Sequence, residues 1–263
     1  MTQDSNVSNL FENARDEGAL SQEAYETLTG VIDIGEQIQA GLGTPADDVT
    51  ASEVVLVTIM PDDSNSIAWA GNTGNVRAGH NVVLDALSES KQSDELLVHT
   101  RLLNGEVIYP FGPLDQAVRL DAGNYDPRYG TPLYDQSLVV LGGVLAKSQE
   151  FADNGVPVRT VTLIVTDGED IHSRHTAADV AVVVRAMLAQ ENHIIAAMGI
   201  DDGHTSFRDV FAQMGILPQW ILTPGNTDSE IRKAFQVFSQ SAVRASQSAA
   251  SFSQQQLGGG FGT

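Results

Sequence analysis

The 263-residue chain contains no cysteine, and it carries only 14 Lys and Arg residues against 34 Asp and Glu residues. Without cysteine it can form no disulfide, no thiolate zinc site and no cysteine nucleophile. A formal net charge of −20 disfavours binding to the phosphate backbone of a nucleic acid, which requires a basic surface. There is no uncharged apolar run of the roughly 20 residues that a membrane helix needs, and residues 1–6 do not resemble a secretory signal. We therefore expect a soluble, cytoplasmic protein with no nucleic-acid or membrane partner.

The negative charge is concentrated at the start of the chain. Residues 1–53 contain eleven acidic residues against Arg15 alone. The spacing of apolar residues predicts a short helix over 5–16 and a longer one over 21–40, and the Gly- and Pro-containing run at 41–45 indicates a linker. We assign residues 1–50 to an acidic helical extension with a solvated charged face. A docking surface for a basic partner is the alternative interpretation.

Strand-like and helix-like segments alternate through residues 51–247, which we assign to one domain. Strands are predicted at 54–60, 159–166, 193–199 and 219–222, with a hairpin formed by 95–103 and 106–111 around Asn104-Gly105. Helices are predicted over 76–90, 135–152, 177–190, 205–214 and 228–247. This alternation predicts an α/β fold: a Rossmann-like, doubly wound, mostly parallel sheet with helices on both faces and one antiparallel strand.

Residues 248–263 form an uncharged tail that is rich in Ser, Gln and Gly. A segment of this composition cannot bury enough apolar surface to fold alone. Phe252, Leu257 and Phe261 are candidate anchors that would attach the tail to the domain or to a neighbouring protein. Assembly of homo- or hetero-oligomers through the two termini is therefore one hypothesis.

A cluster of oxygen-bearing side chains follows the predicted strand at 54–60. It contains Asp62, Ser64 and Ser66, an acid and two hydroxyls at alternate positions. Thr131 and Asp167 stand in two further segments that follow or flank predicted strands, and the carboxyl ends of parallel strands meet at one edge of a sheet. All five side chains offer oxygen, and none offers sulfur or imidazole. The set predicts a divalent cation site suited to Mg²⁺, with Mn²⁺ or Ca²⁺ as alternatives, of which Ca²⁺ requires more ligands.

Together the three segments resemble the metal-ion-dependent adhesion site (MIDAS) of the von Willebrand factor A (VWA) domain family. The matching residues are Asp62-x-Ser64-x-Ser66, Gly130-Thr131-Pro132-Leu133 and Thr166-Asp167-Gly168, and the similarity spans residues 53–243. The resemblance implies that Ser64, Ser66 and Thr131 contact the metal directly, and that Asp62 and Asp167 act directly or through water. It also implies that a protein partner supplies an acidic residue to the open coordination position. The last helix and the stand-alone form are similar to bacterial members associated with tellurium-resistance and stress operons.

Some features depart from the family pattern. Pro61 separates the strand from Asp62, and Asn65 stands between the serines, where the family commonly has glycine. Asp63 adds a third carboxylate, which we expect to tighten metal binding and to weaken the attraction for an acidic ligand. Residues 70–75 are expected to form a loop that could cover or shape the site.

Other interpretations compete with a metal-dependent binding site. The residues of the cluster could serve only to form a turn, in a domain that has this fold but binds no metal. A phosphoryl-accepting Asp62, as in haloacid-dehalogenase-like phosphatases, would require a second Asp where this chain has Ser64, and also a lysine. His172 and His175 could bind a transition metal, although exposed residues at a helix start are the simpler interpretation. Because Ser64 has no recognisable His–Asp partner and the chain has no phosphate-binding loop, we expect no enzymatic activity.

The sequence thus predicts divalent-metal-dependent protein–protein binding within a bacterial multiprotein assembly. The alternative is a structural subunit that assembles through its N- and C-terminal extensions, with the metal incidental. The two hypotheses differ in which part of the chain carries the interaction: the oxygen cluster in the first case, and the termini in the second.

Overall fold

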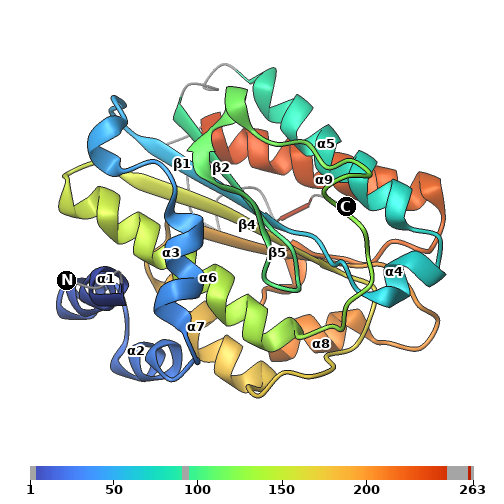
Figure 1. The fold of residues 1–263 in the computed structure, drawn as a ribbon, viewed down its shortest axis with the longest axis horizontal. Helices are drawn as coiled ribbons and strands as arrows, with labels where there is room; N and C mark the ends of the chain where they lie inside the picture. Colours follow the sequence, from blue (N-terminus) through green and yellow to red (C-terminus); the bar gives the residue numbers. More distant parts are fainter. Residues whose placement is uncertain (1–3, 91–94, 248–259, 262–263) are drawn as a thin grey trace.

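A six-stranded sheet forms the centre of the structure, a computed structural model that describes residues 4–90, 95–247 and 260–261. Its strands are β1 (Val54–Met60), β2 (Leu96–Arg101), β3 (Val107–Pro113), β4 (Val158–Thr166), β5 (His193–Gly199) and β6 (Ile221–Leu222). They lie in the order β3-β2-β1-β4-β5-β6, and every neighbouring pair is parallel except β2 and β3. The predicted doubly wound α/β fold with one antiparallel strand is confirmed (Figure 1).

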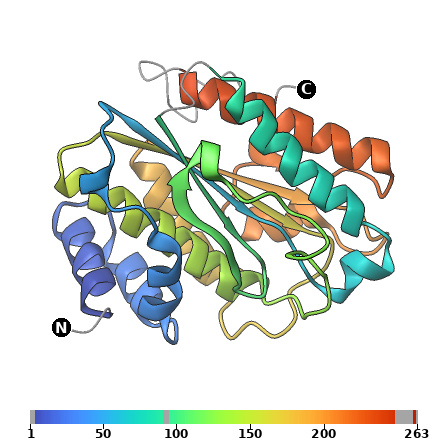
Figure 2. The ribbon, with the colours of Figure 1, turned by 45° about the horizontal axis from the view of Figure 1, so that its top comes forward.

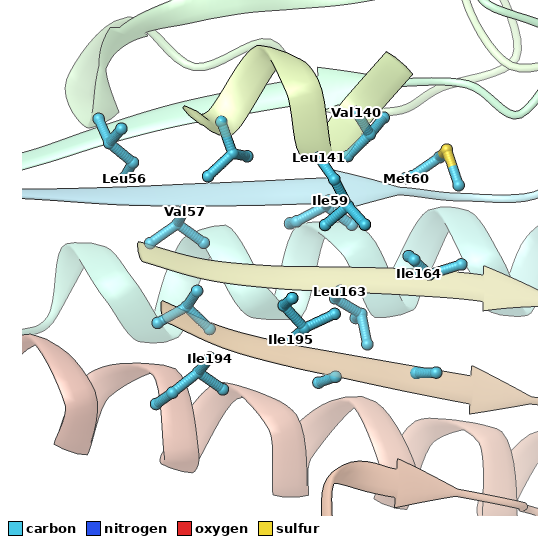
Figure 3. Packing of buried hydrophobic residues seen from close by; sticks show 14 of the residues in the cluster. Leu56, Val57, Ile59, Met60, Val140, Leu141, Leu163, Ile164, Ile194 and Ile195 are labelled. Atoms are coloured by element: carbon cyan, nitrogen blue, oxygen red, sulfur yellow. The ribbon is translucent and has the colours of Figure 1, made fainter. Parts of the chain in front are cut away.

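Burial on both faces explains why the central strands are nearly continuous apolar runs. Every residue of β1, β4 and β5 is buried, as expected for parallel strands that helices cover on both sides. Figure 3 shows apolar side chains of these three strands packed together and against Val140 and Leu141 of helix α6 (Leu133–Asp153). β1 and β4 pair from Val54↔Val158 to Met60↔Ile164, so both strands end at the same edge of the sheet.

Helices cover the two faces of the sheet. α5 (Thr73–Ser88) and α9 (Asp228–Gln247) lie on one face, and α6 and α7 (Ala177–Ala189) lie on the other (Figures 1 and 2). α8 (Phe207–Gln213) packs against α7 and β5.

A short helix that the sequence does not predict, α4 (Asn65–Trp69), follows β1 closely. The backbone N–H of Ala70 closes its last turn onto the carbonyl of Ser66 at 2.8 Å. The expected loop over 70–75 is therefore wrong, because only residues 70–72 separate α4 from α5.

The N-terminal helices α1 (Asp4–Asp16), α2 (Gln22–Thr29) and α3 (Ile34–Leu42) pack against α6, α7 and β3. Phe11, Leu28 and Ile38, one from each helix, belong to the same buried hydrophobic cluster as the sheet. All three meet the face of α6 at Gly142, where an added Cβ would lie 3.0–3.3 Å from their side chains. The absence of a side chain at Gly142 lets the three helices approach α6 closely.

The single helix predicted over 21–40 is wrong. The chain leaves the helical path between Thr29 and Ile34, where Asp33 adopts a left-handed conformation (φ 53°). This break turns α3 away from α2. As a result α3 packs on α6 and β3, while α2 packs on α7. The remaining predicted helices and strands are present, with boundaries shifted by a few residues at most. Among the described residues, no helix is both long and apolar enough to cross a membrane.

Candidate metal site

The five candidate residues lie at the carboxyl edge of the sheet, beside the ends of β1 and β4. The chain passes from β1 to β2 on one side and later returns to β4 on the other side of β1. In open α/β sheets, ligands bind at such a switch point, because the loops that leave the two strands diverge there. Residues 61–66 follow β1, and Asp167 directly follows β4.

Asp62 is completely buried, and neighbouring groups fix both of its carboxylate oxygens. Its Oδ1 accepts a hydrogen bond from the backbone N–H of Ser64 at 2.7 Å. Its Oδ2 accepts one from the Thr166 hydroxyl at 2.6 Å. The carboxylate is thus held between β1 and β4 before any ligand binds.

The hydroxyls of Ser64 and Ser66 connect to the second acid of the site. Ser64 stands at the N-cap position of α4, but its side chain makes no capping hydrogen bond. Instead the two serine Oγ atoms lie 2.7 Å apart, and Ser66 Oγ donates to Asp167 Oδ1 at 2.5 Å. The result is a continuous row of oxygen atoms from β1 to β4.

Thr131 reaches the site because residues 129–131 run alongside the start of α4. The backbone N–H of Asn65 donates to the Tyr129 carbonyl at 3.0 Å, and Ser64 and Tyr129 form an isolated parallel bridge. A Cβ placed on Gly168 would lie 3.5 Å from Ser66 Oγ and 3.8 Å from Thr131 Oγ1. Both hydroxyls therefore flank the backbone that follows Asp167, and the structure brings all five predicted residues to one place.

Asp63, expected as an additional carboxylate beside the metal, faces a different neighbour. Its Oδ1 accepts the backbone N–H of Asn104 at 3.0 Å, and its Oδ2 accepts the Asn104 side-chain amide. Asp63 thus anchors the turn between β2 and β3. The expectation that it tightens metal binding as a further oxygen of the cluster finds no support in these contacts.

Burial makes the ionised forms of these acids unfavourable. Desolvation raises the pKa of Asp62, against the effect of its hydrogen bonds from Ser64 and Thr166. Desolvation also raises the pKa of Asp167 to about 7, with further increases from the charges of Asp62 and Asp202. The pKa of Asp63 is raised to about 7, again mainly by desolvation. Within the described part of the chain, none of the three acids takes part in an ion pair with a basic residue.

The oxygen atoms that converge here suit a small, hard cation. Two buried carboxylates and three hydroxyls supply oxygen only, as Mg²⁺, Mn²⁺ and Ca²⁺ prefer. A divalent cation would also supply the positive charge that the two buried acids lack among their described neighbours. On this chemical criterion, the residues present fit a divalent cation.

Two residues that hold the site in shape were not singled out from the sequence. Tyr125 is completely buried and donates its phenol O–H to the backbone carbonyl of Asp62. Arg77 of α5 in turn donates to the carbonyl of Tyr125 at 2.5 Å. Thr166, the second residue, belongs to the Thr-Asp-Gly segment, and its hydroxyl holds Asp62 Oδ2. Its place before Asp167 was a usable signal, whereas nothing near Tyr125 in the sequence indicates its role.

The histidines considered as transition-metal ligands lie in the loop before α7. His175 Nδ1 lies 2.7 Å from Asp135 Oδ1, and Thr176 caps the helix that follows. His172 is exposed, has a left-handed backbone (φ 87°) and lies against Gly130. The described residues contain no group of three or more His, Cys, Asp or Glu side chains that could hold a metal.

Neither a family model nor a curated protein matches the sequence. Solved structures resemble its fold. The pilus adhesin SpaC from Lactobacillus rhamnosus GG aligns with a TM-score of 0.53 at 14% sequence identity, covering 74% of this chain and 31% of the adhesin. The vWF domain of the type V pili tip protein Mfa5 from Porphyromonas gingivalis aligns with a TM-score of 0.50 at 9% identity, covering 76% of this chain and 98% of that domain. This chain therefore corresponds to less than a third of the SpaC adhesin.

Proposed function

We propose that this chain, which has a von Willebrand factor A-like fold, binds a divalent cation and uses it to recognise an acidic side chain of a protein partner. In this proposal Ser64, Ser66 and Thr131 contact the cation, and Asp62 and Asp167 do so directly or through water. The observation that carries the proposal is the convergence of these five side chains at the carboxyl edge of the sheet. The bound cation would supply an electrophilic coordination position for an incoming carboxylate.

Mg²⁺ is the cation that we expect. Two carboxylates give a formally neutral site with Mg²⁺, and neutral hydroxyl ligands leave the ion electron-poor. Ca²⁺ takes six to eight oxygen ligands, more than the five residues supply unless water or bidentate carboxylates contribute. Mn²⁺ accepts the same hard oxygen ligands and is the natural experimental substitute.

Exposed apolar residues near the site support a protein partner. Trp69 is 83% exposed, Ile171 55% and Tyr129 40%, and they are three of the five large hydrophobic residues found exposed in the described part of the chain. Trp69 lies one helical turn after Ser66 on α4. The Tyr129 carbonyl accepts a hydrogen bond from the backbone N–H of Asn65, and the Ile171 N–H donates to the Thr131 carbonyl at 2.8 Å. Gathered apolar and aromatic side chains of this kind are typical of protein-binding surfaces.

Assembly through the N-terminal extension has less support. The apolar side of α1, α2 and α3 is buried against α6, α7 and β3, which leaves mainly the acidic side for a partner. α1 and α2 also lie at the opposite end of the molecule from α4 (Figures 1 and 2), whereas Gln37 of α3 accepts a hydrogen bond from Arg101 at the end of β2.

Calorimetric titration with Mg²⁺ tests the cation site. The wild type should bind one equivalent, whereas Asp62→Asn and Thr131→Val should lose at least tenfold in affinity. Both substitutions preserve the shape of the side chain and remove a ligand atom or its charge. Thr223→Val, an exposed threonine on the segment after β6, is the matched control and should bind as the wild type does. Equal affinity in all four proteins would exclude this cation site.

Capture of a partner from a lysate tests the second half of the proposal. A partner of the cation site should bind the wild type in Mg²⁺, dissociate in chelator, and fail to bind Thr131→Val. A partner that binds Thr131→Val equally well in chelator would interact through another surface and would contradict recognition through the metal.

A further inference from the structure

Two described residues of the predicted tail, Gly260 and Phe261, lie in a groove beside β6 that is formed by Gln219 and Trp220. Phe261 is 7% exposed and packs edge-on against Trp220, with ring centroids 5.2 Å apart. Its backbone N–H donates to the carbonyl of Gln219 at 3.0 Å. The sequence predicted Phe261 as an anchor, and these contacts confirm it. The other two candidate anchors, Phe252 and Leu257, fall outside the described residues.

The groove requires a glycine before the aromatic residue. Gly260 has a left-handed backbone (φ 84°), which strains any residue with a side chain. A Cβ at this position would lie 2.1 Å from the Gln219 carbonyl oxygen. The backbone of Gly260 thus lies directly on the backbone of Gln219, and only glycine permits this approach.

A cavity of about 640 Å³ continues beyond the ring of Phe261, between β6 and α9. Its apolar lining includes Pro218, Leu222, Ala234 and Val237. Arg208, Glu230 and Lys233 also line it and are exposed. Phe261 thus forms part of the wall of this cavity, and charged residues stand beside its apolar lining.

We propose that this groove is a peptide-binding site for a glycine–aromatic dipeptide, and that its occupant is the Gly260–Phe261 segment of this chain. The main-chain bond to Gln219 sets the register of the peptide, Trp220 receives the aromatic ring, and the Gln219 carbonyl excludes a side chain at the preceding position. This combination of main-chain pairing beside a sheet edge with a pocket for one side chain is a general mode of peptide recognition. Because the occupant is a short linear segment, the same peptide supplied as a separate molecule should bind once the groove is vacated. The site does not depend on the cation.

Fluorescence of Trp220 gives a direct measurement. The chain has two tryptophans, so the full-length Trp69→Phe variant leaves the buried Trp220 as the sole reporter. Adding Phe261→Ala should expose the indole and shift its emission to longer wavelength. The peptide Gly-Gly-Gly-Phe-Gly-Thr should then restore the original emission saturably, with and without chelator. A far-ultraviolet circular dichroism spectrum unchanged by Phe261→Ala would establish that the fold is retained, and Phe261→Leu should give an intermediate shift.

Two control peptides separate the predicted recognition from non-specific apolar binding. Replacing Phe by Ala in the peptide should abolish binding, and replacing the preceding Gly by Ala should weaken it at least tenfold. The protein with its own Phe261 intact should bind the parent peptide at least tenfold more weakly, because its own tail competes. An unchanged Trp220 emission in Phe261→Ala, no binding of the parent peptide, or equal binding of the Gly-to-Ala peptide would each overturn the proposal.

Discussion

Asp167→Asn should stabilise the metal-free protein while abolishing its response to Mg²⁺. Asp167 is 3% exposed, and its pKa is raised to about 7 by desolvation and by the charges of Asp62 and Asp202. A carboxyl whose pKa is higher in the folded state than in the unfolded state stabilises the fold below the unfolded pKa, and this contribution is lost as pH rises through the folded pKa. At about pH 8 the wild type therefore carries the full cost of an ionised, buried acid.

The raised pKa gives the magnitude. A rise in the pKa of Asp167 from the ordinary aspartate value of 3.8 to about 7 corresponds to about 4 kcal/mol, since a tenfold change in an equilibrium constant is worth ~1.4 kcal/mol. Asparagine can still accept the Ser66 hydroxyl and removes the charge, so its gain in unfolding free energy should be positive and at most about 4 kcal/mol. Mg²⁺ at 100 times its dissociation constant should stabilise the wild type by about 2.7 kcal/mol and should leave Asp167→Asn nearly unchanged.

Urea unfolding at about pH 8, in chelator and in Mg²⁺, measures both effects. Glu169→Gln is the matched control, since it removes a charge from an exposed side chain two residues away and should change stability by less than about 0.5 kcal/mol. The reasoning is refuted if Asp167→Asn is less stable than the wild type in chelator. It is also refuted if the variant keeps the full stabilisation by Mg²⁺.

Three further predictions concern the groups that support the site and the core. Tyr125→Phe removes the hydrogen bond to the Asp62 carbonyl, so Mg²⁺ affinity measured by calorimetry should fall several-fold. An unchanged affinity would mean that Tyr125 contributes to core packing but does not position Asp62 for the metal. Desolvation lowers the pKa of His99 to about 4, so its contribution to stability is present above about pH 6.5 and declines as pH falls towards 4, by ~2 kcal/mol at pH 5. His99→Gln should remove that amount from the loss of unfolding free energy between about pH 6.5 and pH 5, and an unchanged loss would contradict the assignment. Phe11→Ala should cost about 3–5 kcal/mol in one cooperative transition monitored by circular dichroism, whereas two separate transitions would show that the N-terminal helices unfold independently.

The sequence alone determined the architecture of the sheet. The strand over 193–199 and the helix over 228–247 have the predicted boundaries, because burial on both faces demands a continuous apolar run and a helix on the surface demands a 3.6-residue period. The antiparallel strand was predictable from Asn104-Gly105, since this dipeptide favours the tight turn of a hairpin. Errors arose where local geometry overrides periodicity, as at the break between α2 and α3 and at the unpredicted helix α4.

The sequence also identified which polar residues would meet, because strand ends in a parallel sheet share one edge. Only the tertiary structure decided how they meet. Asp62 and Asp63 are adjacent, yet the first faces Ser64 and Thr166 while the second anchors the turn at Asn104. The contact of Tyr125 with Asp62 spans 63 positions, and no local pattern encodes it. Residue spacing fixes which strand end each side chain follows, but side-chain direction and long-range hydrogen bonds depend on the packing of loops from separate parts of the chain.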